Sequence, residues 1–147
     1  MAPGVQAAPP ILGRSERLNF LQSGFGFGER ISVAPLPVLT NHGVIVVTSD
    51  PAYPYYAGGV FGPYQGWLDQ FPTGLFLNED SGQLLVSSYI DRGHTVGSGV
   101  VGDIEVHNNG LIDVYSDNRA IGIETSELFS NRGALFVTGV GTGLGVI

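Results

Sequence analysis

Carboxylates are among the residues of this chain that could do chemistry. Asp69, Glu79 and Asp80 lie in or beside a stretch rich in aromatic residues. Two carboxyl groups placed on either side of a sugar can hydrolyse a glycosidic bond. Acidic residues that flank turns are usually just solvated, however. We therefore assign none of the three a catalytic role.

Histidines could in principle bind a metal ion. His42, His94 and His107 occur singly, and His42 and His107 adjoin turns of the same type. A metal site would need further ligands at a matching spacing, and no carboxylate recurs at such a spacing. The sequence predicts surface turn positions for the histidines and no metal site.

Glycine-rich motifs give no catalytic signature either. The stretch GVGTGLG (Gly139–Gly145) resembles a phosphate-binding loop, but it lacks the Gly-Lys-Ser/Thr ending, and the chain contains no lysine. Ser98, in VGSGV, lacks the glycine spacing of a nucleophile elbow. We predict that the protein is not an enzyme and uses no cofactor.

Composition indicates β-structure dense in turns. The 147 residues include 23 glycines, 9 prolines and no cysteine; 43% are hydrophobic and 13% charged. This is too apolar for a disordered chain and too rich in glycine for a helical bundle. The net charge is −7 and the six basic residues are scattered arginines, so we expect no nucleic-acid partner. No apolar run is long enough for membrane insertion, and the N-terminus lacks a signal-peptide pattern.

A repeated motif organises the chain from residue 41 onward. Four segments share Asn/Asp-x-Gly-x-Ile/Leu-x-Val, namely NHGVIVV (Asn41–Val47), DSGQLLV (Asp80–Val86), NNGLIDV (Asn108–Val114) and NRGALFV (Asn131–Val137). Each precedes a second signature, AGGV, GSGV, AIGI or GLGV. The last two copies are offset by 23 residues at both signatures, and the earlier offsets of 28 and 39 residues require longer connections. The matched offsets indicate a repeating structural unit.

The unit has the chemistry of a stacked coil. Its alternating residues predict a short strand with Ile112 and Val114 facing inward and Leu111 and Asp113 facing outward. The corresponding inward pairs are Ile45/Val47, Leu84/Val86 and Leu135/Val137. We predict an all-β fold, a short β-solenoid with coils of about 23 residues that bury their apolar faces against each other. A β-sandwich is the alternative, because its strands also recur with glycine turns.

The first residues of the motif are predicted to form the corners of the coils. Asn and Gly tolerate positive φ, and stacked Asn side chains could form a hydrogen-bonded ladder. The second glycine of each unit is expected to turn the chain again. The predicted corner residues are Asn41, Gly43, Asp80, Gly82, Asn108, Gly110, Asn131 and Gly133.

The repeats resemble those of known proteins. The pattern NNGLIDVYSDNRAIGI…SNRGALFVTGVGTGLGV is similar to the β-helical repeats of bacterial autotransporter and filamentous-haemagglutinin-like adhesins, and of some phage fibres and spikes. The resemblance covers residues 80–147 clearly and 41–60 loosely. It is a pattern of residue types, and it therefore implies a fold more than a function.

Two regions lie outside the repeat. Residues 1–40 are predicted to form an extended N-terminal arm that docks on a neighbour, and residues 41–147 to form the solenoid domain. Residues 51–80 are predicted to be an aromatic-rich insertion that caps the stack, contacts another subunit or stacks on a sugar. The candidate partner-binding residues are Phe20, Phe25, Phe27, Tyr53, Tyr55, Tyr56, Tyr64 and Trp67.

These features favour a non-enzymatic structural component of a multi-subunit assembly. The expected assembly is a phage or phage-like virion, in which the chain is a fibre, spike, capsid or tail accessory protein. Its expected partners are other subunits, as a homo-oligomer such as a trimer or beside another virion protein. The alternatives are a bacterial surface or extracellular adhesin that binds a host or glycan, and a carbohydrate-active β-helix enzyme.

Overall fold

The computed structural model describes residues 5–7, 11–23, 27–28, 30–32, 38–49, 56–61, 74–89 and 96–147. Side chains are described for residues 11–19, 38–49, 57–61, 74–89 and 96–147. Within these ranges the secondary structure is all β, with no helix. It follows that no helix in this part of the chain could cross a membrane.

The strands form three sheets, numbered here in the order in which β6, β7 and β8 pass through them. Sheet 1 contains β2 (Ile11–Leu12), β6 (Val38–Asn41), β9 (Gly74–Asn78), β12 (Ile104–Asn108) and β15 (Phe129–Asn131). Sheet 2 contains β3 (Arg17–Ser23), β4 (Phe27–Gly28), β7 (Val44–Ser49), β10 (Gln83–Ser88), β13 (Leu111–Ser116) and β16 (Ala134–Gly139). Sheet 3 contains β1 (Val5–Ala7), β5 (Arg30–Ser32), β8 (Tyr56–Phe61), β11 (Val96–Val101), β14 (Arg119–Glu124) and β17 (Thr142–Val146).

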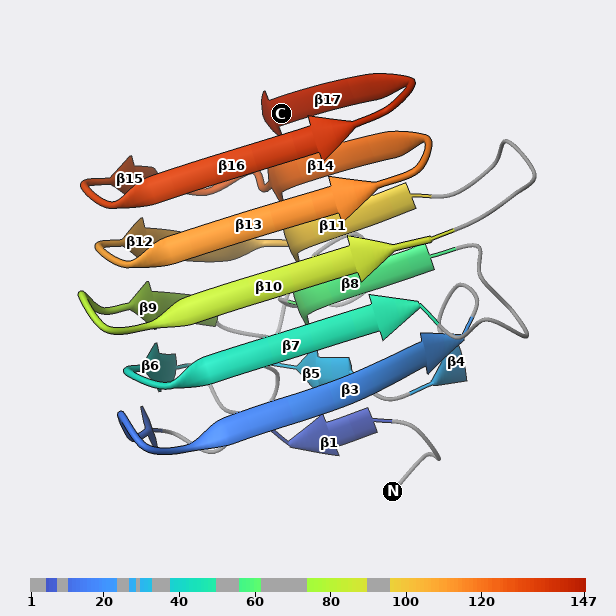
Figure 1. Ribbon diagram of the computed structural model, residues 1–147. Helices are drawn as coiled ribbons and strands as arrows, with labels where there is room; N and C mark the ends of the chain where they lie inside the picture. The colour runs from blue at the N-terminus through green and yellow to red at the C-terminus, as the bar shows by residue number, and fades with distance from the viewer. Residues whose placement is uncertain are drawn as a thin grey trace.

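Apart from β3 and β4, consecutive strands belong to different sheets, and this produces layers. The chain passes through sheets 1, 2 and 3 in turn, so that β12, β13 and β14, for example, make up one layer. The layers are stacked from the N-terminal to the C-terminal end (Figure 1), and the strands of neighbouring layers pair in parallel. Among the described strands, β4 is the exception, because it pairs with β3 in the antiparallel sense. This order differs from a sandwich of hairpins, in which consecutive strands pair with each other.

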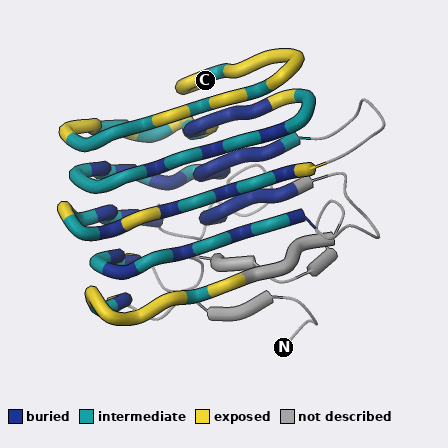
Figure 2. Tube along the Cα trace, in the orientation of Figure 1, coloured by how far each residue is buried: buried dark blue, intermediate teal, exposed yellow. Residues whose placement is uncertain are grey.

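The interior is built from one side of each strand. In sheet 2, buried and half-buried residues alternate along β7, β10 and β13, as a strand with one inward face requires. The predicted inward pairs Ile45/Val47, Leu84/Val86 and Ile112/Val114 are fully buried, and Leu135 and Val137 pack against the same core while partly exposed. Figure 2 shows the alternation along the three strands. The inward and outward assignments made from the sequence are confirmed.

Sheet 3 uses glycine for a reason that the sequence did not reveal. Gly59, Gly99 and Gly122 lie inside β8, β11 and β14, so the second glycine of the motif is part of a strand and the predicted turn at this point is wrong. A Cβ atom at any of these positions would lie less than 3.0 Å from the carbonyl oxygen of the corresponding glycine one layer above. The layers pack too closely here for any side chain.

The boundary expected at residue 40 does not coincide with a break in the sheets. Strand β6 crosses it, β2 pairs with β6, and β3 pairs with β7 over Arg17–Gln22. The described part of residues 1–40 therefore extends the three sheets. Parallel pairing is made by backbone groups and needs no Asn-x-Gly motif, which is why the motif did not mark these strands.

The region of residues 51–80 also contributes to the sheets. Strands β8 and β9 both lie within it, and they pair with the equivalent strands of the next layer. The longer offsets between the early motifs arise between strands. Residues 62–73 separate β8 from β9, whereas residues 102–103 suffice between β11 and β12.

Candidate interaction surfaces

A column of asparagine amides fixes the corner between sheets 1 and 2. Asn41 donates a hydrogen bond from Nδ2 to Oδ1 of Asn78 at 2.8 Å, Asn78 donates to Asn108 at 2.7 Å, and Asn108 donates to Asn131 at 2.8 Å. The first three side chains are 0% exposed. The hydrogen-bonded ladder predicted from the sequence is present, and it sets the register of the strands on either side of the corner.

One member of this ladder was assigned incorrectly from the sequence. Asp80 aligns with Asn41, Asn108 and Asn131 in the repeated motif, but strand pairing places Asn78 opposite Asn41 and Asn108. The turn after β9 is longer than the turns after β6, β12 and β15, and Asp80 lies exposed within it. The chemistry of the ladder could have identified Asn78, because each member must donate and accept, and an ionised carboxylate cannot donate.

The corner glycines are required by close approach. A Cβ atom at Gly43, Gly82, Gly110 or Gly133 would lie less than 3.0 Å from a backbone oxygen of the layer below. Among the described residues, positive φ occurs only at Gly102, at 117°. The sequence-based explanation that these glycines adopt positive φ is therefore wrong. The corner glycines nevertheless lie where they were predicted.

The outward face of sheet 2 is a flat surface with an apolar centre. Its rows follow from the strand pairing: Val46 lies beside Leu85, and Val44 lies beside Gln83, which lies beside Leu111. The aliphatic residues at outward positions of β7, β10 and β13 are all half-buried: Val44, Val46, Leu85 and Leu111. In the last layer Phe136, in the same row as Leu85, is 58% exposed. The sequence analysis identified outward positions but did not recognise this surface.

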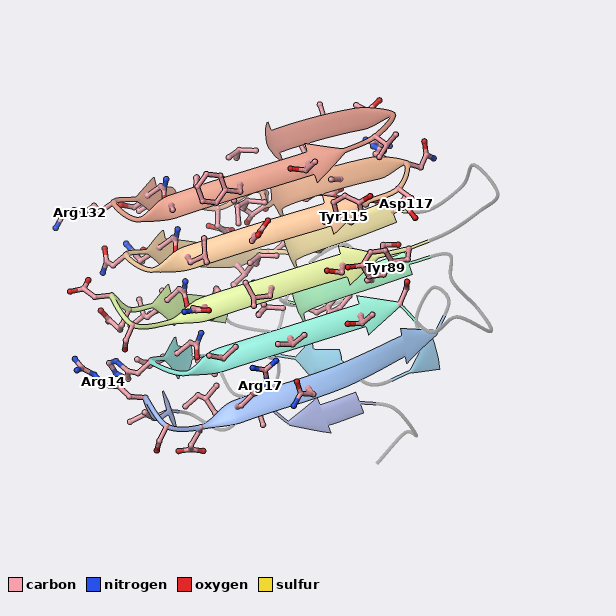
Figure 3. All side chains as sticks on the ribbon, in the orientation of Figure 1. Arg14, Arg17, Tyr89, Tyr115, Asp117 and Arg132 are labelled. Carbon is pink, nitrogen blue, oxygen red and sulfur yellow. The ribbon has the colours of Figure 1, made fainter. Side chains whose placement is uncertain are left out.

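Charged residues are sparse on this face. Its outward positions on β3, β7, β10 and β13 carry Arg17 near one end of the stack and Asp113 near the other. Figure 3 shows Arg17 on the face turned toward the viewer. Nε of Arg17 donates a hydrogen bond to Oδ1 of Asn19 at 3.1 Å, so its guanidinium group leans along β3 into the row of Asn19.

Two tyrosines lie together at the end of sheet 2 where β10 and β13 end. The ring centroids of Tyr89 and Tyr115 are 5.5 Å apart and the rings are tilted by 39°. The hydroxyl of Tyr115 donates to Oδ1 of Asp117 at 2.5 Å (Figure 3). Tyr89 is 54% exposed, which leaves an aromatic surface beside a carboxylate.

The same hydrogen bond shifts the titration of Tyr115. The Asp117 carboxylate accepts a hydrogen bond from the phenolic hydroxyl and repels a phenolate, so it raises the pKa of Tyr115 above its ordinary value; burial and Tyr89 act in the same direction. Because the folded state holds this proton more tightly than the unfolded state, the contribution to stability is present below the ordinary tyrosine pKa and is lost as the pH rises through the folded pKa.

We expect Asp117→Asn to lower the pKa of Tyr115, because the substitution removes the negative charge beside the phenol. Tyrosinate absorbance followed during a pH titration measures the change, and Tyr115→Phe identifies the component that belongs to Tyr115. An unchanged titration curve in Asp117→Asn would contradict this assignment.

The remaining sequence candidates form no reactive group. Nε2 of His107 lies 2.6 Å from Oε1 of Glu105 on the outward side of sheet 1. Glu79 accepts a hydrogen bond from Asn109 at 3.4 Å, and His42 lies half-buried in the turn after β6. Within the described ranges, no cluster of three or more histidine or acidic side chains could hold a metal ion. His94 and Asp69 lie outside the described residues.

The side chains of the predicted partner-binding aromatics all lie outside the described set. Phe25, Tyr53, Tyr55, Tyr64 and Trp67 lie outside the described residues. The backbones of Phe20, Phe27 and Tyr56 belong to β3, β4 and β8, while their side chains lie outside the described set. Their role in partner binding stays a prediction.

The outward face of sheet 2 and the tyrosine pair are the features of the described residues that could contact a partner, while the asparagine ladder sets the register of the strands. Comparison with known proteins finds no family model, no curated protein and no solved structure that matches this chain.

Proposed function

We propose that the chain is a short β-solenoid that serves as a non-enzymatic structural module of a multi-subunit assembly. The observation that carries the proposal is the in-register stack of layers, joined through parallel strands and an internal amide ladder. A stack of this kind buries its apolar side chains in a continuous interior and leaves flat sheet faces outside. Flat faces of defined spacing suit a rigid spacer or a packing unit.

A phage or phage-like virion is the assembly that we favour. The resemblance of the repeats to fibre and spike proteins supports this choice, and so does the flat apolar outer face of sheet 2, because an apolar face on a protein surface is typical of a contact with another protein. In this function the outer faces pack against other subunits, and the ladder keeps those faces at a fixed register.

Localisation of the protein tests this proposal. Antibodies raised against the purified chain, labelled with gold, should decorate particles purified from the organism that encodes it. Label on intact bacterial cells and none on particles would support the adhesin instead. Label on neither would overturn both functions, and antibodies absorbed with the purified chain provide the control.

A second candidate, an adhesin that binds glycans, is favoured by one observation. Tyr89 presents an exposed ring beside Tyr115 and Asp117, and aromatic rings with a neighbouring polar group can stack on a sugar and orient it. This function predicts that a glycan array binds the purified chain and that Tyr89→Ala reduces binding at least about tenfold, which corresponds to roughly 1.4 kcal/mol. Tyr89→Phe keeps the ring and serves as the matched control.

A further inference from the structure

We infer that the outward face of sheet 2 binds a second copy of this chain, face to face, around a two-fold axis that runs parallel to the strands between β7 and β10. The inference rests on the proposed structural function and specifies the partner. The four strands that take part are β3, β7, β10 and β13, which are neighbours in the sheet.

The first argument is the composition of the face. Outward positions normally carry polar residues when they meet only water, but Val46 and Leu85 are neighbours on β7 and β10. Val44 and Leu111 lie in the next row, on either side of Gln83. An aliphatic patch of this kind is typical of a protein contact. In the flanking row, Thr48 and Ser87 are small and would not obstruct a second sheet, and Tyr115 lies beside Ser87 on β13.

The second argument is the position of the two charges. Strand pairing places Asn19, Val46, Leu85 and Asp113 in one row across the sheet. Asp113 is half-buried between Leu85 and Phe136. In the part of the chain that the structure describes, neither Arg17 nor Asp113 has an ion-pair partner. A cation that approaches this half-buried carboxylate from outside would form an ion pair with it.

A two-fold axis between β7 and β10 supplies that cation. It exchanges β3 with β13 and β7 with β10, so Val46 of one copy faces Leu85 of the other. It also places the row position of Asn19 opposite Asp113 of the second copy. Because the Arg17 guanidinium leans toward Asn19, it would lie beside that carboxylate, and the arrangement forms the ion pair twice. One surface thus carries both halves of a self-complementary contact, as a two-fold dimer requires.

The size of the face sets the expected strength. Four strands about 4.8 Å apart and about 20 Å long give roughly 400 Å² per copy. The two copies together bury about 800 Å², which is less than stable specific interfaces bury and is typical of weak, transient contacts. We therefore expect a dimer that dissociates in the micromolar range, about 8 kcal/mol of binding free energy, and that becomes effectively permanent only where an assembly raises the local concentration.

Charge exchange tests the axis. Sedimentation velocity over a concentration series should show a monomer–dimer equilibrium for the wild type. Arg17→Glu and Asp113→Arg should each weaken dimerisation at least about tenfold, because each places like charges opposite one another. The double variant Arg17→Glu/Asp113→Arg should recover most of the affinity, because it restores the pair with its charges exchanged.

A pair of matched apolar substitutions tests the face itself. Leu85→Lys should abolish the dimer, because it places an ammonium group against Val46 of the second copy. Leu77→Lys makes the same change at a half-buried outward position of sheet 1 and should leave the dimer intact. Circular dichroism melts of all variants should superimpose on the wild type, which excludes unfolding as the cause.

The inference is overturned if the wild type is a monomer at high concentration, if it forms trimers or open polymers, or if the double variant fails to recover. A dimer that is insensitive to Leu85→Lys would also overturn it. None of these results bears on the decoration of particles by antibodies, so the proposed function and the proposed partner can fail separately.

Discussion

Replacing Gly99 with alanine is expected to lower the free energy of unfolding by roughly 3 kcal/mol, an effect of overpacking. The added Cβ would lie less than 3.0 Å from the carbonyl oxygen of Gly122 and at 3.0 Å from Cγ2 of Val114. The oxygen belongs to the backbone of β14 and cannot move without breaking the pairing of β11 with β14. Denaturant unfolding of the purified variant measures the loss.

The matched control lies in the same column. Gly145 occupies the equivalent position in β17, but no atom lies within 4 Å of its Cβ position. Gly145→Ala should therefore change stability by less than about 0.5 kcal/mol or raise it slightly, because alanine restricts the unfolded chain. Equal losses for Gly99→Ala and Gly145→Ala would show that glycine is required for another reason than the close approach of layers.

Replacing Asn78 with leucine is expected to cost about 4 kcal/mol. The Asn78 amide accepts from Asn41 and donates to Asn108 Oδ1 at 2.7 Å and to the backbone oxygen of Leu111 at 3.1 Å. Leucine has a similar volume but leaves the buried acceptors unpaired, and each costs about 1–3 kcal/mol. Thermal and denaturant unfolding of the variant should both shift.

Asn109 provides the comparison for this prediction. It is half-buried at the same corner, but the only hydrogen bond of its side chain among the described residues is a long one to Glu79, at 3.4 Å. Asn109→Leu should cost less than about 1 kcal/mol. The ladder would not stabilise the fold in the way argued if both substitutions cost the same, or if Asn78→Leu were neutral.

Much of the repeat could be predicted from the sequence because its signals are local. The alternation around Ile112 and Val114 reports which side of a strand is buried, and it does so without reference to any neighbour. The Asn-x-Gly corners were predicted for the same reason. Stacking of Asn108 on Asn131 then followed from the equal spacing of the two copies.

The features that were missed depend on contacts between layers. Asp80 and Asn78 are both compatible with a turn, and only pairing with Asn41 and Asn108 distinguishes them. The glycines of sheet 3 were predicted to form turns, because the local sequence does not indicate that a carbonyl oxygen of the next layer lies close to them. Leu12 pairs with Asn41 and occupies the position that asparagine holds in the later layers. The first layer therefore lacks the motif, and it was interpreted as an arm.

The apolar face of sheet 2 was missed for a different reason. Val46, Leu85 and Phe136 come from three separate copies of the motif, each of which contains a single outward apolar residue in that row. A single residue of this kind is common on protein surfaces. Such residues form an apolar surface only when the strand register brings the residues of several copies into one row.

The parallel pairing of layers has a consequence for how the chain reaches its structure. Apart from β3 and β4, every strand pairs with a partner at least 23 residues away, as Leu111 does with Ala134. Each pairing must close a long loop, and the entropy lost on closure precedes the stabilising contacts. Chains dominated by such distant contacts fold slowly. We therefore expect folding to begin where the connections are shortest, around β13 and β14, and to spread outward by adding one layer at a time to an existing edge. The terminal layers would then open first when the protein is destabilised, long before the centre exchanges its amide protons.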